Sequence, residues 1–254
     1  MIYGQKTTNE FTILAACDSS YLYKYAKSFI TSCGVVKNNV HIHLVSSDQQ
    51  DIDYLEFLKK GYTILNPTGY FTYSYDNTIN GKKLNDLKEP ELTERKVYYQ
   101  CSRFRIIEEI VNCDILILDI DSLILKNIEV LDADVGLFFR HNFKSKHKDP
   151  WLTEAGQIPA GIVYCSKNHL DFFSIVNQTI ESDRKLSGLE QMGLLRAFQH
   201  FKDKRYKEIS LDFFDWKMTE GTPIWTAKGN KGKTTPRFLS KQKEILRSFP
   251  LGEK

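Results

Sequence analysis

Short apolar runs alternate with amphipathic segments in the first quarter of the chain. The apolar runs have the length of buried strands, and the segments after them have helical spacing. Gly34 and Gly61 follow these segments as helix stop signals. This alternation is typical of parallel β-α-β units and predicts a sheet of the nucleotide-binding type. The predicted strands are 11–17, 40–45 and 62–65, and the predicted helices are 21–33 and 51–60.

Residues 66–90 break this alternation. They contain two prolines, two glycines and the aromatic cluster YFTYSY at 70–75. A connection of this length is typical of a functional lid or a disordered loop, and we predict that no strand forms here. The segment 93–112 has apolar residues at helical spacing and predicts a long amphipathic helix.

The rest of the chain continues the mixed pattern without an internal repeat or an interdomain linker. We therefore predict one α/β domain over residues 1–254. The predicted strands are 114–126, 134–139, 162–165 and 224–227; the helices are 170–181, 189–201 and 237–248; the loops are a polar one at 141–157 and a Gly/Lys-rich one at 228–235.

Composition narrows the class of protein. Of the 254 residues, 41% are hydrophobic and 13% aromatic, which is enough for a sizeable core. The net charge of +3 does not argue for nucleic acid as a partner. The five cysteines lie in apolar segments without a C-x-x-C pair, and neither an apolar leader nor a run of about 20 apolar residues occurs. We expect a soluble, cytoplasmic protein with reduced cysteines.

The most informative motif is DILILDIDSLILK at 114–126. In an extended strand Asp119 and Asp121 share one face, and Ile120 between them points into the core. Two like charges that close raise one pKa unless a cation lies between them. A hard divalent cation that also binds a diphosphate meets this need. The alternative is a solvated strand end where one aspartate caps the next turn.

Asp18 ends the first predicted strand as Asp119 ends the D-x-D strand. Ligands of open α/β sheets bind beyond the carboxyl ends of the strands. Both carboxylates are therefore predicted to lie beside a nucleotide. Asp18 has an equal alternative as the N-cap of the following helix.

These segments resemble the glycosyltransferase family 8-like enzymes of the GT-A fold, which use a nucleotide-sugar and Mn²⁺. The resemblance spans nearly the whole chain and is strongest in RFRIIEEIVNCDILILDIDSLI at 103–124. TILAACDSSY, PAGIVY and EQMGLL are similar to the family's first strand, its strand beside the donor sugar and its acidic-Gln pair. The resemblance implies a mostly parallel, mixed sheet flanked by helices, with a nucleotide-binding half at about 1–125 and an acceptor-side half at about 126–254.

The resemblance also implies the site residues. Asp119 and Asp121 would hold Mn²⁺ or Mg²⁺, Arg103 would contact the donor, and Gln191 would lie over the anomeric carbon. Pro159 replaces the usual polar residue before Ala160, which affects one sugar contact. Asp121 and Gln191 are the implied catalytic residues. The implied nucleotide-sugar contacts are Ala16, Asp18, Arg103, Asp119, Ile120, Ala160, Gly161, Gln191, Gly229 and Lys231.

The tail departs from the family pattern. Thr226 stands three residues before Gly229, where the family has a metal-binding His. The third ligand is left open among water, Asp212 and Asp215. The lysine on the diphosphate is left open among three candidates, and an exposed loop is the alternative for the whole segment. The three candidates are Lys228, Lys231 and Lys233.

The implied function is metal-dependent transfer of a hexose from a UDP-sugar to a glycan, lipid or protein. Retention of configuration fits the family, although Gln191 is too weak a nucleophile for double displacement. Inversion would need a carboxylate base beside the acceptor hydroxyl, and Glu154 and Asp149 lie on an acceptor-side loop. The aromatic cluster at 70–75 is a candidate acceptor groove, with a packed loop as an equal alternative. The alternatives are a degenerate nucleotide-binding GT-A protein and a haloacid dehalogenase-like phosphatase.

Two further features have structural alternatives. We interpret the three tryptophans as core or rim residues rather than as sugar platforms. They are Trp151, Trp216 and Trp225. The last helix, 237–248, combines apolar and basic residues. It is interpreted as a cover for the sheet, with peripheral contact to an anionic membrane as the alternative.

Overall fold

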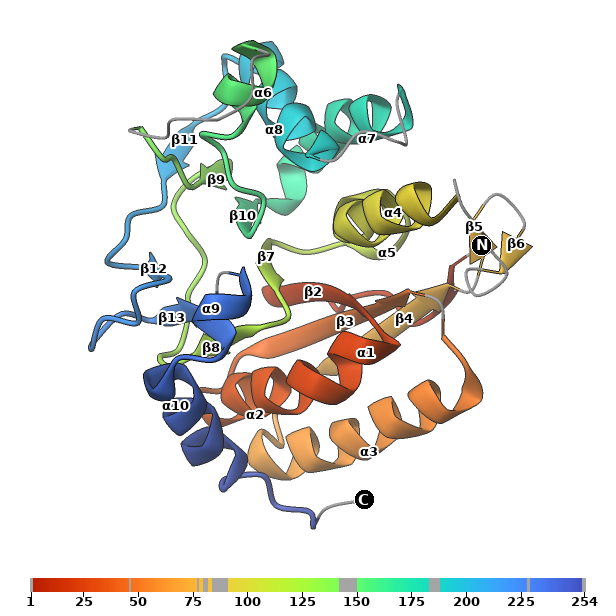
Figure 1. Cartoon of the computed structure of the whole chain (residues 1–254), viewed down its shortest axis with the longest axis vertical. Coiled ribbons are helices and arrows are strands. Elements are labelled where there is room, and N and C mark those ends of the chain that lie inside the picture. Colours follow the sequence, from red (N-terminus) through yellow and green to blue (C-terminus); the bar gives the residue numbers. More distant parts are fainter. Residues whose placement is uncertain are drawn as a thin grey trace.

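The computed structural model describes residues 2–45, 47–76, 78–79, 82–83, 91–141, 150–182, 188–227 and 229–252 (Figure 1). Its centre is an eight-stranded mixed sheet in the order β1-β4-β3-β2-β7-β10-β9-β11. The predicted α/β class is confirmed. Strands β4, β3, β2 and β7 are parallel, whereas β10 is antiparallel to both β7 and β9. The strands are β1 Tyr3–Gly4, β2 Thr12–Asp18, β3 Asn39–Val45, β4 Phe71–Asp76, β7 Ile115–Asp119, β9 Val135–Leu137, β10 Ile162–Cys165 and β11 Tyr206–Glu208.

Two smaller sheets accompany the large one. A three-stranded sheet joins β8 (Ser122–Ile124), β13 (Ile224–Thr226) and β12 (Phe214–Asp215), and a two-stranded sheet pairs β5 (Thr78–Ile79) with β6 (Lys82–Lys83). Strand β7 belongs to the large sheet and β8 to the small one. The chain therefore changes sheets at residues 120–121, inside the D-x-D motif.

Helices cover both faces of the large sheet, as Figure 1 shows. Alternate residues of the central strands enter opposite cores: Ile13 lies in the cluster under α2 and α3, and Leu14 in the cluster under α4, α7 and α8. Burial on both faces explains why these strands are almost continuously apolar. The helices are α1 Ser19–Tyr21, the π-helical turn Leu22–Ala26, α2 Lys27–Val35, α3 Gln49–Leu65, α4 Glu91–Arg105, α5 Ile107–Ile110, α6 Pro150–Ala155, α7 Phe172–Ser182, α8 Leu189–His200, α9 Gly229–Lys233 and α10 Pro236–Leu246.

The predicted strand at 62–65 is wrong, because α3 continues through Gly61 to Leu65. Gly61 is not a stop signal. A Cβ on Gly61 would lie 2.2 Å from Cζ of Phe249, so the missing side chain makes room for this ring. Gly34 likewise lies inside α2, where a Cβ would come within 3.1 Å of Leu65. Both glycines mark close packing.

The prediction of a lid or loop without a strand at 66–90 is also wrong for its first part, because β4 pairs in parallel with β3. Phe71, Tyr73 and Tyr75 pack toward one core, and the residues between them face the other side. This alternation of aromatic and polar residues is the signature of a strand. Residues 77, 80–81 and 84–90 lie outside the described residues.

Most of the other predicted elements are confirmed with shifted ends. The loop predicted at 228–235 is wrong for residues 229–233, which form helix α9, and the strand predicted at 114–126 is divided into β7 and β8. The helix expected at 93–112 is divided into α4 and α5 around Ile106, and the polar loop at 141–157 contains α6. Helix α10 buries Phe238 and Ile245. All five cysteines are buried and none forms a disulfide. None of the helices in the described ranges combines the length and apolar character that crossing a bilayer requires.

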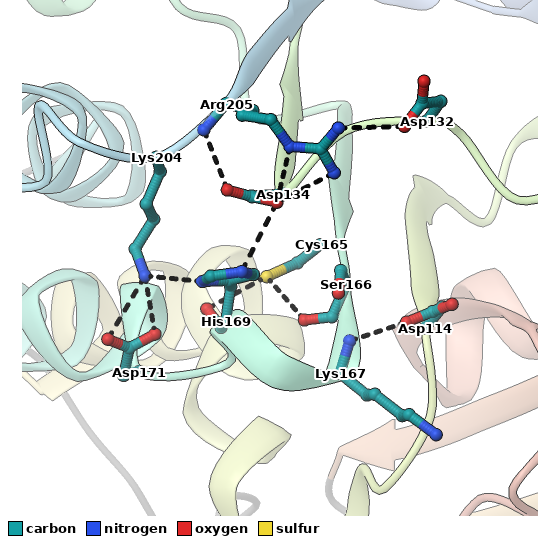
Figure 2. A network of polar contacts seen from close by, with 10 residues as sticks. All are labelled: Asp114, Asp132, Asp134, Cys165, Ser166, Lys167, His169, Asp171, Lys204 and Arg205. Carbon is teal, nitrogen blue, oxygen red and sulfur yellow. Dashed lines mark hydrogen bonds and ion pairs between the residues drawn. The ribbon is translucent and has the colours of Figure 1, made fainter.

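A network of polar contacts joins β9, β10 and β11 (Figure 2). Asp134, directly before β9, accepts hydrogen bonds from the backbone N–H of Arg205 at 2.9 Å and from its guanidinium at 3.3 Å. His169 lies between Asp134 and Lys204, and Lys204 contacts both oxygens of Asp171 at 2.9 and 3.2 Å. These residues lie at the amino ends of β9 and β11. They therefore fix the end of the sheet that is opposite to Asp119.

Candidate active site

A cavity of about 560 Å³ opens at the carboxyl ends of β2 and β7. This is the position at which open α/β sheets bind their ligands. Lys231 is exposed and does not line the cavity. The other implied catalytic, metal and nucleotide-sugar residues all line it: Ala16, Asp18, Arg103, Asp119, Ile120, Asp121, Ala160, Gly161, Gln191 and Gly229.

A turn brings the two aspartates of the D-x-D motif into this cavity. They do not lie on one extended strand as predicted, because β7 ends at Asp119 and β8 begins at Ser122. The backbone N–H of Asp119 donates to the carbonyl of Gly161 at 3.3 Å, and the carbonyl of Asp121 accepts from Ala227 at 3.3 Å. Ile120 is 3% exposed in the core, as predicted.

Arg103 of α4 pairs with Asp119. Its guanidinium is largely enclosed, and Nη1 donates to Oδ1 of Asp119. Burial alone would lower the pKa of Arg103, but the carboxylates of Asp119 and Glu190 raise it overall. The guanidinium therefore stays charged beside the cavity.

Lys233 of α9 pairs with Asp121. Its ammonium lies 2.7 Å from Oδ2, and the two side chains are 12% and 10% exposed. Lys233 also donates to the Tyr21 hydroxyl at 2.7 Å and lies 4.5 and 5.2 Å from the ring centres of Tyr21 and Tyr25. Burial and the charge of Asp119 raise the pKa of Asp121 to about 6, although Lys233 lowers it. Opposite charge and two aromatic faces thus hold this cation in place.

Gly161 and the start of α8 form the next part of the wall. A Cβ on Gly161 would lie 2.8 Å from Oδ2 of Asp119, so only glycine leaves this carboxylate its room. Glu190 is 8% exposed, and burial raises its pKa. Gln191 lines the cavity beside it. Gly193, in the same EQMGLL motif as Glu190 and Gln191, packs against the backbone of Val176. It lets α8 approach α7 closely.

Asp18 shows both features that the sequence left open. Its Oδ1 accepts from the backbone N–H of Tyr21 at 2.9 Å, so it is the N-cap of α1. It also lines the cavity together with Tyr21.

The donor set for a divalent cation consists of the two motif carboxylates. Asp212 is exposed, and the oxygens of Asp215 accept hydrogen bonds from Lys217 and Thr219; neither aspartate lines the cavity. Among the described residues, no group of three His, Cys, Asp or Glu side chains is arranged to hold a metal. Two carboxylates nevertheless fit Mg²⁺ or Mn²⁺, which take further oxygens from water and phosphate.

Of the remaining candidates that the structure describes, Thr226 lines the cavity. It stands at the position of the family's His and is 4% exposed. Lys228 and Asp149 lie outside the described residues. Glu154 accepts from Gln199 and lies outside the lining, as do residues 70–75.

Sequence reasoning missed several lining residues. Tyr99 and Gln100 lie on α4 within one turn of Arg103, so helical spacing from Arg103 was a usable signal for them. Arg140, Phe214 and Trp216 had no such signal. Of the three tryptophans, Trp216 lines the cavity, Trp225 is buried and Trp151 is 44% exposed on α6.

Glycosyltransferases are among the solved structures that share this architecture. The galactosyltransferase LgtC, in complex with donor and acceptor sugar analogues, matches with a TM-score of 0.57 and 13% identity over 96% of this chain and 98% of LgtC. WbbM, a bifunctional glycosyltransferase, matches with a TM-score of 0.63 and 11% identity over 96% of this chain. The chain has the GT-A fold of glycosyltransferases.

GlyE of Streptococcus pneumoniae TIGR4 has the same GT-A fold, with a TM-score of 0.56 and 10% identity over 94% of this chain. The chain spans 50% of the WbbM chain and 63% of the GlyE chain. No protein-family model and no curated protein sequence matches it. The GT-A fold predicted from the sequence is thus confirmed by structure alone.

Proposed function

We propose that this protein is a glycosyltransferase that moves a hexose-type sugar from a UDP-sugar to a carbohydrate-type acceptor on a glycan, lipid or protein. The observation that carries the proposal is one cavity, at the carboxyl ends of β2 and β7, in which two aspartates each face a cation. Asp119 and Asp121 supply the anionic side, and Arg103 and Lys233 supply the cationic side. The GT-A fold is the second support.

The donor would lie along the charged side chains of Asp119, Asp121, Arg103 and Lys233. We propose that the nucleoside binds between Asp18 and Tyr21, and that the diphosphate replaces Asp121 as the partner of Lys233. The sugar would then lie beside Gly161 and Gln191. As the bond to the sugar breaks, the leaving diphosphate gains negative charge, which the Lys233 ammonium stabilises at a site shielded from water.

A divalent cation fits this arrangement. Asp119 and Asp121 would hold Mn²⁺ or Mg²⁺, which supplies Lewis-acid stabilisation of the leaving diphosphate when bound. Asp121 offers its Oδ2 to Lys233 in this structure. When a metal binds Asp121, Lys233 must therefore either move away from Oδ2 or share the carboxylate with the metal, so that the two cations bind different oxygens.

We propose transfer with retention. The amide of Gln191, which lines the cavity, is too weak a nucleophile for the covalent intermediate of a double displacement, so we propose retention without a covalent bond between sugar and protein. Glu190 beside it is buried, and burial raises its pKa. Its carboxyl group is therefore suited to bind a sugar hydroxyl rather than to attack carbon.

The test is release of UDP from a panel of UDP-sugars with Mn²⁺, beside hydrolysis of p-nitrophenyl phosphate. UDP release that is lost in Asp121→Ala and kept in the exposed control Asp203→Ala supports the proposal. Binding of UDP without release from any donor indicates a nucleotide-binding protein without transferase activity. Hydrolysis of the phosphomonoester alone indicates a phosphatase.

A further inference from the structure

Trp216 lines the same cavity as the D-x-D motif. A Cβ on Gly161 would be 2.8 Å from Oδ2 of Asp119 and 3.8 Å from Cζ of the Phe214 ring. Trp216 follows Phe214 by two residues and contacts its ring, with centroids 6.3 Å apart. A chain of contacts therefore links Gly161, beside Asp119, to Phe214 and through Phe214 to Trp216.

Two other rings fix the plane of the Trp216 indole. Phe138 contacts it at 5.1 Å with an interplanar angle of 74°, and Phe214 contacts it at 90°. Edge-to-face contacts of this kind are favourable, because the positive edge of one ring meets the negative face of another. Trp216 is half-buried and lines the cavity. It is thus a large ring held in one orientation at the cavity wall.

The turn that carries Trp216 is built at a conformational cost. Oδ1 of Asp215 accepts from Lys217 N–H at 2.7 Å, and Oδ2 accepts from the N–H and hydroxyl of Thr219 at 2.8 and 2.5 Å. Between them Met218 has a φ of 62°, which is uncommon for a residue with a side chain. Such strain persists only where the surroundings over-determine it, and it clusters at functional sites.

We propose that Trp216 is the platform on which a pyranose ring of the acceptor stacks. This inference rests on the proposed function and names the residue that binds and orients the acceptor sugar. The C–H groups on one face of a pyranose carry partial positive charge, which suits the negative face of an indole. Gln100 and Arg140, which line the same cavity, offer polar partners to the sugar hydroxyls at the rim.

Stacking also gives a reason for the fixed orientation of the Trp216 indole. A pyranose presents several hydroxyls of similar chemistry, so a fixed plane selects the one that faces the donor. In the proposed function the nucleoside binds between Asp18 and Tyr21, so the nucleobase does not occupy this ring.

Saturation-transfer difference NMR on the UDP-loaded protein tests this inference. The probes are the methyl glycosides of glucose, galactose and mannose, with glycerol as a non-pyranose control. We expect at least one glycoside to receive saturation mainly at the protons of one ring face. The signal is lost in Trp216→Ala, kept in Trp216→Phe and unchanged in Trp151→Ala, whose ring lies outside the cavity lining.

Measurements of turnover then distinguish an effect on acceptor binding from an effect on donor binding. In Trp216→Ala we expect hydrolysis of the UDP-sugar by water to stay within about twofold, while KM for the binding glycoside rises about tenfold or more. Absence of any glycoside signal, an unchanged signal in Trp216→Ala, or equal losses for donor and acceptor would overturn the inference. Glycoside binding without UDP release would overturn the proposed transferase and leave the sugar platform standing.

Discussion

The ammonium of Lys233 lies 2.7 Å from Oδ2 of Asp121, and both side chains are almost fully enclosed. The hydroxyl of Tyr21 and the rings of Tyr21 and Tyr25 complete the surroundings of this ammonium. An enclosed ammonium with these partners is itself a cation at the D-x-D motif. A metal ion that approaches Asp121 must therefore displace it or face its charge.

Lys233→Gln is expected to bind Mn²⁺ in the absence of nucleotide about tenfold more tightly than the unmodified protein. The substitution removes both the competitor at Asp121 and the repulsion between two cations. Calorimetry with Mn²⁺ alone measures the change. Loss of Lys233 raises the pKa of Asp121 further above about 6, so the titration belongs near pH 8, where the carboxylate is ionised.

The same variant is expected to bind UDP about tenfold more weakly, because a charge-assisted contact to the diphosphate is lost. Lys243→Gln, an exposed change on α10, is the matched control and leaves both affinities as they were. Equal Mn²⁺ affinity in the two proteins would show that the ammonium does not guard Asp121. Lys231→Gln distinguishes the lysine first chosen from the sequence from the one that lines the cavity.

Gly161→Ala is expected to weaken Mn²⁺-dependent UDP binding by about tenfold, or about 1.4 kcal/mol. The new Cβ would lie 2.8 Å from Oδ2 of Asp119, and Arg103 holds the same carboxylate from the other side. The carboxylate must shift, and its distance to Asp121 changes with it. Calorimetric titration with UDP and Mn²⁺ measures the effect.

Gly252→Ala provides the comparison, because a Cβ there meets no atom within 4 Å. Urea unfolding of both variants separates a lost site from a lost fold. A Gly161→Ala protein of normal stability with full UDP affinity would contradict the assignment of Asp119 to the binding site.

The central strands were predictable because burial on both faces leaves little choice of residue. Ile13 and Leu14 serve opposite cores, so the run that contains them is apolar throughout. Gly61 misled the prediction for a physical reason. A glycine that ends a helix and a glycine that admits a neighbouring ring look alike in sequence, and the ring belongs to Phe249, which is distant along the chain.

The site was predictable where its residues are close in sequence. Asp119 and Asp121 share one motif, and Arg103 lies one helix earlier. Lys233 was only one of three candidate lysines, because the choice depends on how the short helix α9 faces Asp121. Trp216 was interpreted as a core or rim residue. Its place at the cavity follows from a turn whose strain at Met218 has no sequence signal.

Stability is expected to fall below about pH 6.5 because of His41. Burial, followed by the nearby His43, lowers the pKa of His41 from 6.5 to about 3. Its two ring nitrogens contact the hydroxyls of Thr72 and Ser74 at 2.8 and 2.9 Å. Between these pH values the unfolded chain binds a proton that the folded protein does not, so stability rises with pH across the window. The cost at pH 5 is about 2 kcal/mol.

His41→Gln removes the contribution of His41 to the pH dependence of stability. Urea unfolding near pH 7.5 and near pH 5 is expected to show a difference between the two pH values that is smaller by about 2 kcal/mol in the variant. The other groups that face this cluster are His43 and Asp76, with Tyr98 of α4 donating to Asp76, and they remain in place. His200→Gln, an exposed change of the same kind, keeps the full pH dependence. Identical slopes in His41→Gln and the unmodified protein would remove His41 as the cause.

Gly61→Ala is expected to destabilise the fold by about 1–3 kcal/mol, as overpacking does. Propensity alone predicts the reverse, because alanine is better than glycine inside a helix by about 1 kcal/mol. The packing effect dominates, since the new Cβ would lie 2.2 and 2.3 Å from two carbons of the Phe249 ring. That ring is 7% exposed and fixed between Phe57 and Lys27.

In a Phe249→Ala background the ring is gone, and the alanine at 61 becomes neutral or stabilising. Urea unfolding of the four proteins of this double-mutant cycle measures the coupling directly. Equal effects of Gly61→Ala in the two backgrounds would mean that helix α3 passes through Gly61 for a reason other than the Phe249 ring.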